Sequence, residues 1–178
     1  MMRRLVLTAL LLAPAVTTQA QLTIDVIGGE GRQIPIAITS FGDDAKHSDE
    51  NQMRSIIAQD LAHSGWFRVI TGGAAPTAGN YVSDYARLKT EGAQVALGGA
   101  VSENNAMLET RFELHDVGKR TRLFDQLLRS KPERQRHTAH FIADTVQEML
   151  TGKRGVAGTR ICYVVRDGQR SDFVIADA

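Results

Sequence analysis

The sequence has few of the features that mark disulfide-stabilised, membrane-spanning or nucleic-acid-binding proteins. It contains one cysteine, Cys162, so no internal disulfide bond can form. Its 21 basic and 20 acidic residues give a net charge of +1, which is too small a field to predict binding to nucleic acid or acidic lipid. Beyond the first twenty residues, no stretch is apolar enough to span a bilayer. We therefore expect a chain whose stability comes from the packing of an apolar core.

The first twenty residues have the pattern of a secretory signal peptide. A short basic start, Met1-Met2-Arg3-Arg4, precedes an apolar run broken by Pro14. This run has about a dozen residues, well short of the ~20 that span a bilayer. Thr18 and Ala20 are small residues at the two positions that signal peptidase reads. We expect cleavage after Ala20 and export to the periplasm; the alternative is that residues 1–20 are retained as an amino-terminal anchor.

The segment after the expected cleavage site alternates between apolar and polar side chains, as a β-strand does. Leu22, Ile24 and Val26 lie on one side, and Thr23 and Asp25 lie on the other. Three glycines within residues 27–31 then form a tether that can adopt many backbone conformations. Such a strand can add to the edge of a partner's sheet through main-chain hydrogen bonds. It can equally be the first strand of the domain's own sheet, and the two states are compatible.

Residues 34–154 have the periodicity of an α/β domain. We expect strands at residues 34–42, 66–70, 95–101, 108–114 and 122–128. We expect helices at residues 48–65, 80–91 and 130–152, where apolar side chains recur at helical spacing. The economical arrangement is a mixed, mostly antiparallel sheet with about three helices covering one face, which is an α/β (α+β) fold.

Local signals place the ends of these elements. Ser130 and Glu133 have the spacing of a capping box, so the last helix is expected to start there. Asn104-Asn105 suits a tight turn between the third and fourth strands. The expected core side chains of the second helix are Tyr81, Tyr85 and Leu88.

Residues 155–178 predict a second hairpin. Residues 160–166 read as a strand, Asp167-Gly168 as a turn, and residues 173–175 as the returning strand. A terminal hairpin with no later strand to pair with leaves an apolar edge open, which folded proteins usually avoid. We therefore expect these strands to belong to a further domain that the sequence contains only in part.

Patterns that carry chemistry are scarce. The glycines within residues 28–31 lack the lysine and the Ser/Thr of a phosphate-binding loop. His137, His140 and Asp144 share one stripe of the last helix at spacings that zinc or copper can use, but no fourth ligand is evident. Cys162 lies in an apolar strand, where a thiol behaves as a small hydrophobe. We expect no enzyme activity, metal or cofactor; the alternative is a stand-alone periplasmic domain that binds a small ligand or a metal in the sheet cleft.

Several residues together resemble the TolB family. The most specific stretch runs from Leu150 to Val164 and has the pattern L-T-G-x-x-G-x-x-x-T-R-I-x-Y-V. Further matching residues are Asp60, Leu61, Ser64, Gly65, Phe67, His140, Asp144 and Val146. The resemblance extends from the signal peptide to the last residue, but it covers only the first part of a family member, in which an amino-terminal α/β domain precedes a six-bladed β-propeller.

The resemblance implies a periplasmic, non-enzymatic adaptor of the Tol-Pal system, which maintains outer-membrane integrity and draws that membrane inward during cell division. In the family, the segment after the signal peptide binds the carboxy-terminal domain of TolA. The implied contact residues here are Gln21, Leu22, Thr23, Ile24, Asp25, Val26, Ile27, Gly28, Gly29, Glu30, Gly31 and Arg32. Pal, a peptidoglycan-associated lipoprotein, engages mainly the propeller, so it is expected as a partner only where a propeller is present.

The implied domain organisation has four parts. Residues 1–20 are the signal peptide, and residues 21–33 are a mobile partner-binding strand with its glycine tether. Residues 34–154 are the amino-terminal α/β domain of the family, and residues 155–178 are the opening strands of the propeller.

Overall fold

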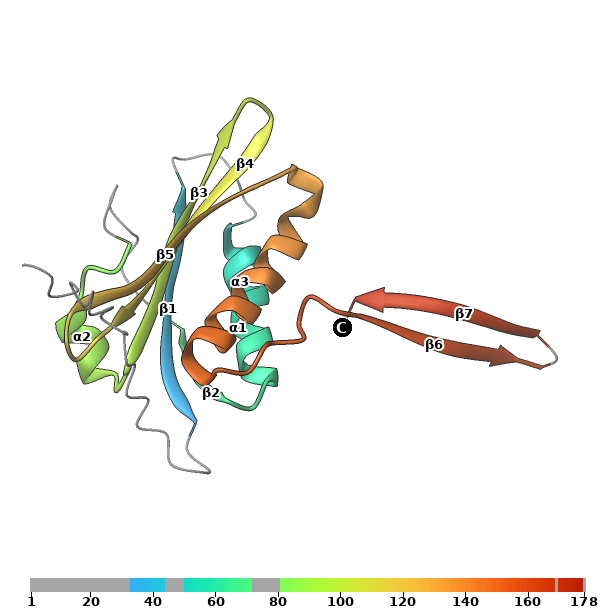
Figure 1. Cartoon of the computed structure of the whole chain (residues 1–178), viewed down its shortest axis with the longest axis horizontal. Coiled ribbons are helices and arrows are strands. Elements are labelled where there is room, and N and C mark those ends of the chain that lie inside the picture. The colour runs from blue at the N-terminus through green and yellow to red at the C-terminus, as the bar shows by residue number, and fades with distance from the viewer. Residues whose placement is uncertain (1–32, 44–49, 72–80, 169, 178) are drawn as a thin grey trace, which may run out of the picture.

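The computed structural model describes residues 33–43, 50–71, 81–168 and 170–177 (Figure 1). In chain order the elements are β1 (Ile34–Asp43), α1 (Glu50–His63), β2 (Phe67–Thr71), α2 (Tyr85–Thr90), β3 (Val95–Asn104), β4 (Met107–Asp116), β5 (Thr121–Ser130), the 3₁₀ turn η2 (Pro132–Arg134), α3 (Gln135–Thr151), β6 (Arg160–Asp167) and β7 (Arg170–Asp177). The first five strands form one sheet in the order β2-β1-β3-β4-β5, and β6 and β7 form a separate hairpin.

β1 lies at the centre of the parallel half of the sheet. It pairs in parallel with β2 on one side and with β3 on the other. Ile36, Ala37 and Ile38 have no exposed surface, because apolar side chains cover both faces of the strand. Strands that are buried on both faces are typically continuous apolar runs, and residues 34–38 are such a run in this sequence.

β3, β4 and β5 form the antiparallel half as a meander. The tight turn between β3 and β4 is centred on Asn105 and Ala106, whose φ angles are 51° and 60°. Two successive left-handed residues are the conformation that matches the twist of a two-residue hairpin. The predicted turn at Asn104-Asn105 is therefore displaced by one residue, because Asn104 pairs with Met107 as the last residue of β3.

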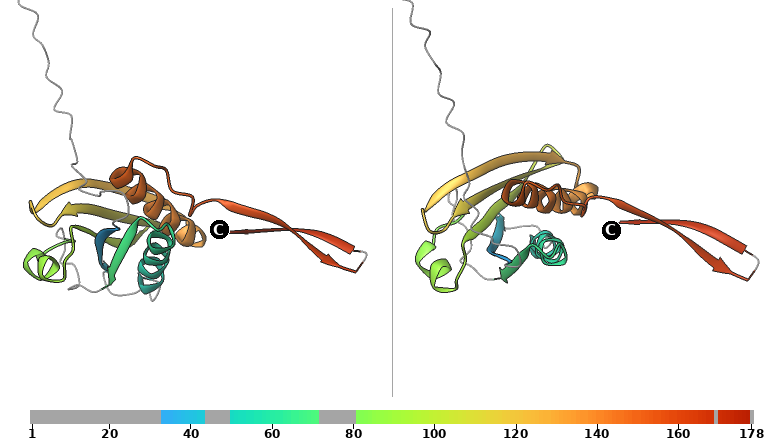
Figure 2. Two further views of the ribbon diagram at one scale, coloured as in Figure 1. Left: turned by 90° about the horizontal axis from the view of Figure 1, so that it is seen from below. Right: turned by 60° about the horizontal axis from the view of Figure 1, so that its bottom comes forward.

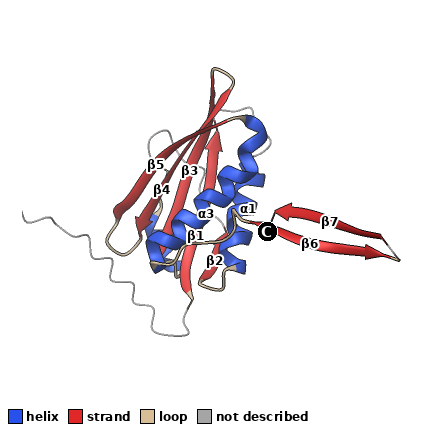
Figure 3. Cartoon of the chain, turned by 45° about the vertical axis from the view of Figure 1, so that its right-hand side comes forward, coloured by secondary structure: helices blue, strands red, loops and turns tan. Residues whose placement is uncertain are grey.

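The sheet separates a large apolar core from a small one. Successive residues of a strand point to opposite faces, so Ile36 and Leu97 face α1 and α3, whereas Ala37 and Ala96 face α2. Figure 3 shows α1 and α3 lying side by side over the sheet. The large core is formed by Ile34, Ile36, Ile38, Phe41, Met53, Ile56, Ile57, Leu61, Phe67, Val95, Leu97, Val101, Leu108, Phe112, Leu114, Ala139, Ile142, Ala143, Val146 and Leu150.

The predicted fold class is confirmed, but the helices do not all cover one face. α2 packs on the face opposite α1 and α3, where its Leu88 contacts the small core. The side chains Ala37 and Ala96 are small, so the backbone before α2 can approach the sheet closely. A Cβ atom at Gly98 would collide with the backbone oxygen of Tyr81. Sequence periodicity identifies a helix but does not say which face of a sheet it covers.

α2 is also shorter than the predicted helix at residues 80–91. Asp84 is its N-cap, and the Asp84 carboxylate accepts a hydrogen bond from the Arg87 N–H at 3.1 Å. Leu88 is buried as predicted, whereas Tyr81 and Tyr85 are only half-buried. Val82, which precedes the helix, is the fully buried residue of this stretch.

The predicted capping box at Ser130 is not formed. η2 precedes α3, and no side chain caps the start of either element. The Ser130 hydroxyl oxygen instead accepts a hydrogen bond from the Thr138 hydroxyl at 3.2 Å. The helix ends as predicted at Gly152, whose φ of 70° is the left-handed conformation that favours glycine at a helix C-terminus.

β6 and β7 form a hairpin that extends away from the main body (Figure 2). β6 lies where the sequence predicts it, whereas β7 is longer than the predicted strand at residues 173–175. The apolar side chains on it are strongly exposed, with Phe173 at 79% and Ile175 at 65%. Among the helices of the described ranges, none combines the length and the apolar character needed to cross a membrane.

We predict that replacing Ile142 by Ala destabilises the domain. Ile142 is fully buried in the large core on α3, and an Ile→Ala change in a core costs about 2–5 kcal/mol. The matched control is Phe141→Ala on the same helix, because Phe141 is 44% exposed and a surface change typically costs about 0.5 kcal/mol. Urea unfolding should separate the two variants; equal losses would contradict the assigned orientation of α3.

Candidate functional site

The predicted partner-binding segment, residues 21–32, lies outside the described residues, so its contacts stay a prediction. The described chain begins at the adjacent Gln33, whose side-chain amide donates a hydrogen bond to the Gly65 oxygen at 3.3 Å. The Ile34 N–H donates to the Trp66 oxygen at 2.8 Å. These two bonds fix the point where the segment joins the domain, next to the turn between α1 and β2.

An exposed aromatic side chain lies at this junction. Trp66 is 40% exposed, and the Lys153 Nζ atom lies 4.7 Å from the centroid of its ring. This distance is within the range of a cation–π contact. Half-exposed tryptophans are frequent anchors of protein interfaces. The junction surface, formed by Gln33, Gly65, Trp66 and Lys153, is therefore a candidate contact area beside the predicted segment.

The position of β1 determines which edges of the described sheet are open. Both sides of β1 are paired, with β2 and with β3. Residues 36–38 of β1 pair with both neighbours, so no further strand can pair with β1 there. In the described sheet, the outer sides of β2 and β5 are the open edges.

The predicted stripe of His137, His140 and Asp144 is not brought together as a ligand set. His140 is buried, and its Nδ1 lies 2.7 Å from the Asp60 Oδ2 on α1. Asp144 faces the chain that follows α3. No grouping of three or more His, Cys, Asp or Glu side chains that could hold a metal is found in the described part of the chain.

The Asp60–His140 pair joins the two helices of the large core. Burial raises the pKa of the Asp60 carboxyl above its ordinary value of 3.8, although the hydrogen bond and the charge of His140 act in the opposite direction. The negative charge of Asp144 also raises this pKa, and Arg136 lowers it. The Nε2 atom of His140 is buried and has no hydrogen-bond partner among the described residues.

Asp144 fixes the backbone after α3. Its two carboxylate oxygens accept the N–H groups of Ala157 and Gly158 at 2.8 and 3.0 Å. A Cβ atom at Gly155 would collide with the Asp144 carboxylate, so only glycine fits there. Thr151 adds a further bond, because its hydroxyl accepts the Lys153 N–H at 3.1 Å. The Leu150–Val164 pattern therefore builds the connection from α3 to β6.

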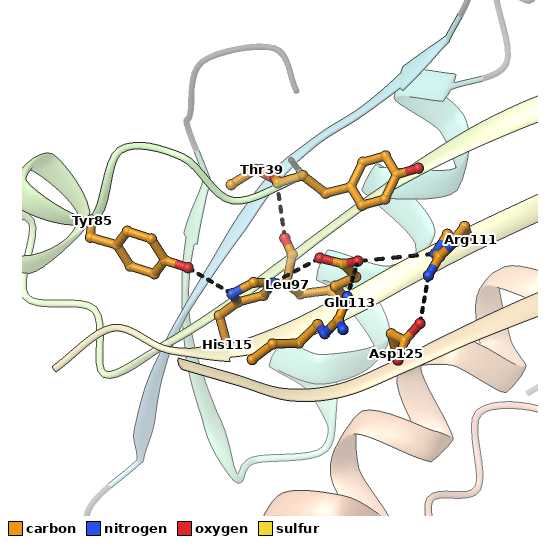
Figure 4. Close-up of polar contacts among 9 residues, drawn as sticks. Thr39, Tyr85, Leu97, Arg111, Glu113, His115 and Asp125 are labelled. Carbon is orange, nitrogen blue, oxygen red and sulfur yellow. Dashed lines mark hydrogen bonds and ion pairs between the residues drawn. The ribbon is translucent and has the colours of Figure 1, made fainter. Parts of the chain in front are cut away.

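A buried polar network lies under α2 on the opposite face of the sheet (Figure 4). The Tyr85 hydroxyl lies 2.8 Å from the His115 Nδ1, and the His115 Nε2 lies 3.0 Å from a Glu113 oxygen. The other Glu113 oxygen accepts a hydrogen bond from Arg122 at 3.0 Å. Arg111 lies 4.0 Å from the same oxygen. We call Tyr85, Glu113, His115 and Arg122 the Glu113–His115 network.

Glu113 and His115 alternate with apolar residues along β4, as solvent-facing side chains do, but both are buried. Their exposed fractions are 5% and 6%, because α2 and its preceding backbone cover this part of the sheet. Alternation along β4 identifies the two faces but cannot show that both are covered. The small residues Ala96 and Gly98 on the neighbouring strand β3 are the signal of close backbone approach that could have indicated it.

The geometry of the Glu113–His115 network suits structural support. A carboxylate can only accept, so His115 donates from Nε2 to Glu113; in the neutral ring, Nδ1 then accepts from the Tyr85 hydroxyl. Burial, and then the charge of Glu113, raise the pKa of Tyr85, so this hydroxyl keeps its proton. The carboxylate of Glu113 is paired with Arg122. The network therefore holds α2 against the sheet.

Two surface grooves lie beside α3. The smaller one has a volume of about 170 Å³ and lies between α1, α3 and the following loop. The larger one, which we call the basic groove, has a volume of about 460 Å³. It is lined by Glu133, Arg134, Arg136, His137, His140, Ala157, Gly158, Thr159 and Arg160.

Comparison with known proteins identifies the family. Residues 22–123 match the model of the TolB amino-terminal domain. The Tol-Pal system protein TolB of Aromatoleum aromaticum is 37% identical over 176 residues, which cover 98% of this chain and 41% of that protein. The TolB of Thiobacillus denitrificans is 38% identical over 162 residues, which cover 89% and 38% respectively. The chain belongs to the TolB family.

The match to TolB extends to a solved structure. The crystal structure of TolB from Acinetobacter baumannii is similar with a TM-score of 0.65 and 24% identity, and the similar region covers 82% of this chain and 36% of that one. At this identity the likeness shows a shared fold. The chain spans about 41% of the length of the first of these TolB relatives, and the predicted resemblance to TolB is confirmed.

We predict that Asp60→Asn changes how stability depends on pH. A carboxyl whose pKa is raised in the folded state contributes stability below its unfolded pKa, and this contribution is lost as pH rises through the folded pKa. The stability of the original chain relative to Asp60→Asn should therefore fall as pH rises from below 3.8. Urea unfolding over a series of pH values measures this; a relative stability that rises with pH would contradict it.

We also predict that Tyr85→Phe loosens α2. The change removes the hydrogen bond to His115 and should cost about 1 kcal/mol. Amide exchange should accelerate in residues 85–90 more than in α1 or α3. Tyr163→Phe is the control, because Tyr163 is 46% exposed on the hairpin; the same acceleration in both variants would refute the structural role.

Proposed function

We propose that this chain is a non-enzymatic periplasmic adaptor of the Tol-Pal system. Its mature amino-terminal segment, residues 21–32, binds the carboxy-terminal domain of a TolA-like protein by strand addition. In this role it supports outer-membrane integrity and inward movement of the outer membrane during division. Family membership supports the Tol-Pal role, and the alternating pattern of Leu22, Ile24 and Val26 supports the mode of binding.

The central position of β1 is the observation that carries this proposal. Because β2 and β3 occupy both sides of β1, the strand-like segment just before it has no hairpin partner next to it in the sequence. Ile34, three residues after the tether of residues 27–31, is fixed to the domain by the hydrogen bond from its N–H to the Trp66 oxygen. We infer that a strand tethered to Ile34 in this way can reach the edge of a partner's sheet.

In strand addition, the main chain and the side chains of the segment have different roles. Main-chain hydrogen bonds to the partner's edge supply affinity, and alternate side chains enter pockets and supply specificity. Burying one Leu, Ile or Val side chain contributes about 1.5–3 kcal/mol. The segment has three such side chains on one side. The free energy gained by burying them offsets part of the cost of ordering the segment.

We further propose that β6 and β7 are strands of the family's β-propeller. Their apolar side chains are exposed on the hairpin, with Ile161 at 52% and Val164 at 51%, as expected of strands that are buried by neighbours in a propeller blade. The connection held by Asp144 then joins the α/β domain to the propeller. Binding of a Pal-like lipoprotein depends on that propeller.

The first test is calorimetric titration of the chain with a TolA carboxy-terminal domain. Deletion of residues 21–32 should abolish the binding heat, whereas the original chain should bind. Unchanged affinity after the deletion would reject the proposal.

A matched pair of substitutions tests the strand geometry. Ile24→Asp and Thr23→Asp introduce the same charged side chain on opposite sides of the segment. Ile24→Asp should weaken binding about tenfold or more, because 1.4 kcal/mol corresponds to tenfold, and Thr23→Asp should have a much smaller effect. Equal weakening would indicate a general electrostatic effect in place of strand addition.

A further inference from the structure

The basic groove combines positive charge with a buried donor site. Arg134 lies at the start of α3, Arg160 lies at the start of β6, and both line the groove. Neither arginine makes an ion pair in the described part of the chain. Glu133 is the one acidic side chain among the lining residues.

His140 supplies a second, independent indication of a ligand. Its side chain is 5% exposed, and it belongs to the lining of the groove. Its Nδ1 is held by Asp60, and its Nε2, the ring nitrogen turned away from Asp60, has no hydrogen-bond partner in the described residues. Buried polar atoms of native proteins nearly always have a partner, so an unpaired one points to a water molecule, an ion or a ligand that would complete it.

We propose that the basic groove binds a small oxyanion, a sulfate-like, phosphate or carboxylate group. Arg134 and Arg160 provide the charge, and the Nε2–H of His140 provides a hydrogen bond from the floor. The site lies at the start of α3 and at the connection to β6, and none of its lining residues belongs to residues 21–32.

Binding is coupled to one proton. When Asp60 is ionised and His140 is neutral, Nδ1–H donates to the carboxylate, and Nε2 carries a lone pair that repels an anion. Adding one proton to the Asp60–His140 pair places a hydrogen on Nε2, either as an imidazolium beside a carboxylate or as a neutral imidazole beside a carboxylic acid. Burial raises the pKa of Asp60, which favours uptake of that proton. Anion affinity should therefore increase as pH falls, until the pair is protonated.

Other charged groups near the Asp60–His140 pair also affect its protonation. Asp144 on α3 disfavours a negative charge on Asp60, and Arg136 favours it. His137 and Glu133 also line the groove. A test of the proton coupling must therefore separate His140 from His137.

The experiment is titration of the chain with sulfate, whose charge is constant between about pH 5 and 8, followed by NMR of the His140 ring nitrogens. Saturable binding should shift the Nε2 resonance to its protonated position. Arg134→Gln and Arg160→Gln should each weaken binding about three- to tenfold, since charge-assisted hydrogen bonds are lost. Arg154→Gln removes the same charge outside the groove and should leave binding unchanged. Succinate and inorganic phosphate, titrated in parallel, distinguish a carboxylate ligand from a phosphate ligand.

The pH dependence decides the role of His140. His137→Gln should retain the increase in sulfate affinity at low pH. His140→Gln should lose it, and Asp60→Asn, which keeps a hydrogen-bond acceptor beside Nδ1, should move it to lower pH. Non-saturable shifts, equal weakening by Arg154→Gln, or an unchanged Nε2 resonance on saturation would overturn the proposal.

Discussion

The placement of β1 between two parallel neighbours is the constraint on which the rest of the fold depends. Because Ile36, Ala37 and Ile38 are completely buried, the strand needs cover on both faces. Its large side chains require the α1–α3 layer, and the small Ala37 allows the backbone before α2 to approach the other face. The same placement leaves β2 and β5 as the edges of the described sheet.

Periodicity predicted the elements well because each is fixed by local spacing. The helix that ends at Gly152 has an uninterrupted apolar stripe, and its end needs a left-handed residue. The capping box at Ser130 failed because Pro132 and its neighbours form a 3₁₀ turn first, which moves the true helix start beyond Glu133. The position of α2 could not be predicted, since it depends on contacts between residues far apart in the sequence.

The buried polar groups were missed for the same reason. Glu113 and His115 alternate with apolar residues, as solvent-facing side chains do, yet Tyr85 and Arg122 from other elements complete their hydrogen bonds. His140 was predicted on a stripe with His137, but its partner is Asp60, 80 residues away in the sequence. A single sequence contains the residue types of such a pair and gives no measure of their distance.

The residues that identify the family are mostly residues of packing and connection. Asp60 bonds to His140, Gly155 leaves room for Asp144, and Asp144 holds the backbone that leads to β6. Each of these needs one particular side chain, so each leaves a recognisable pattern. The predicted binding segment has no such pattern beyond alternation. This contrast follows from the chemistry of strand addition, in which main-chain groups make most hydrogen bonds and pockets accept several apolar side chains. A binding role of this kind is therefore expected to be weakly marked in the sequence even where the domain that presents it is strongly marked.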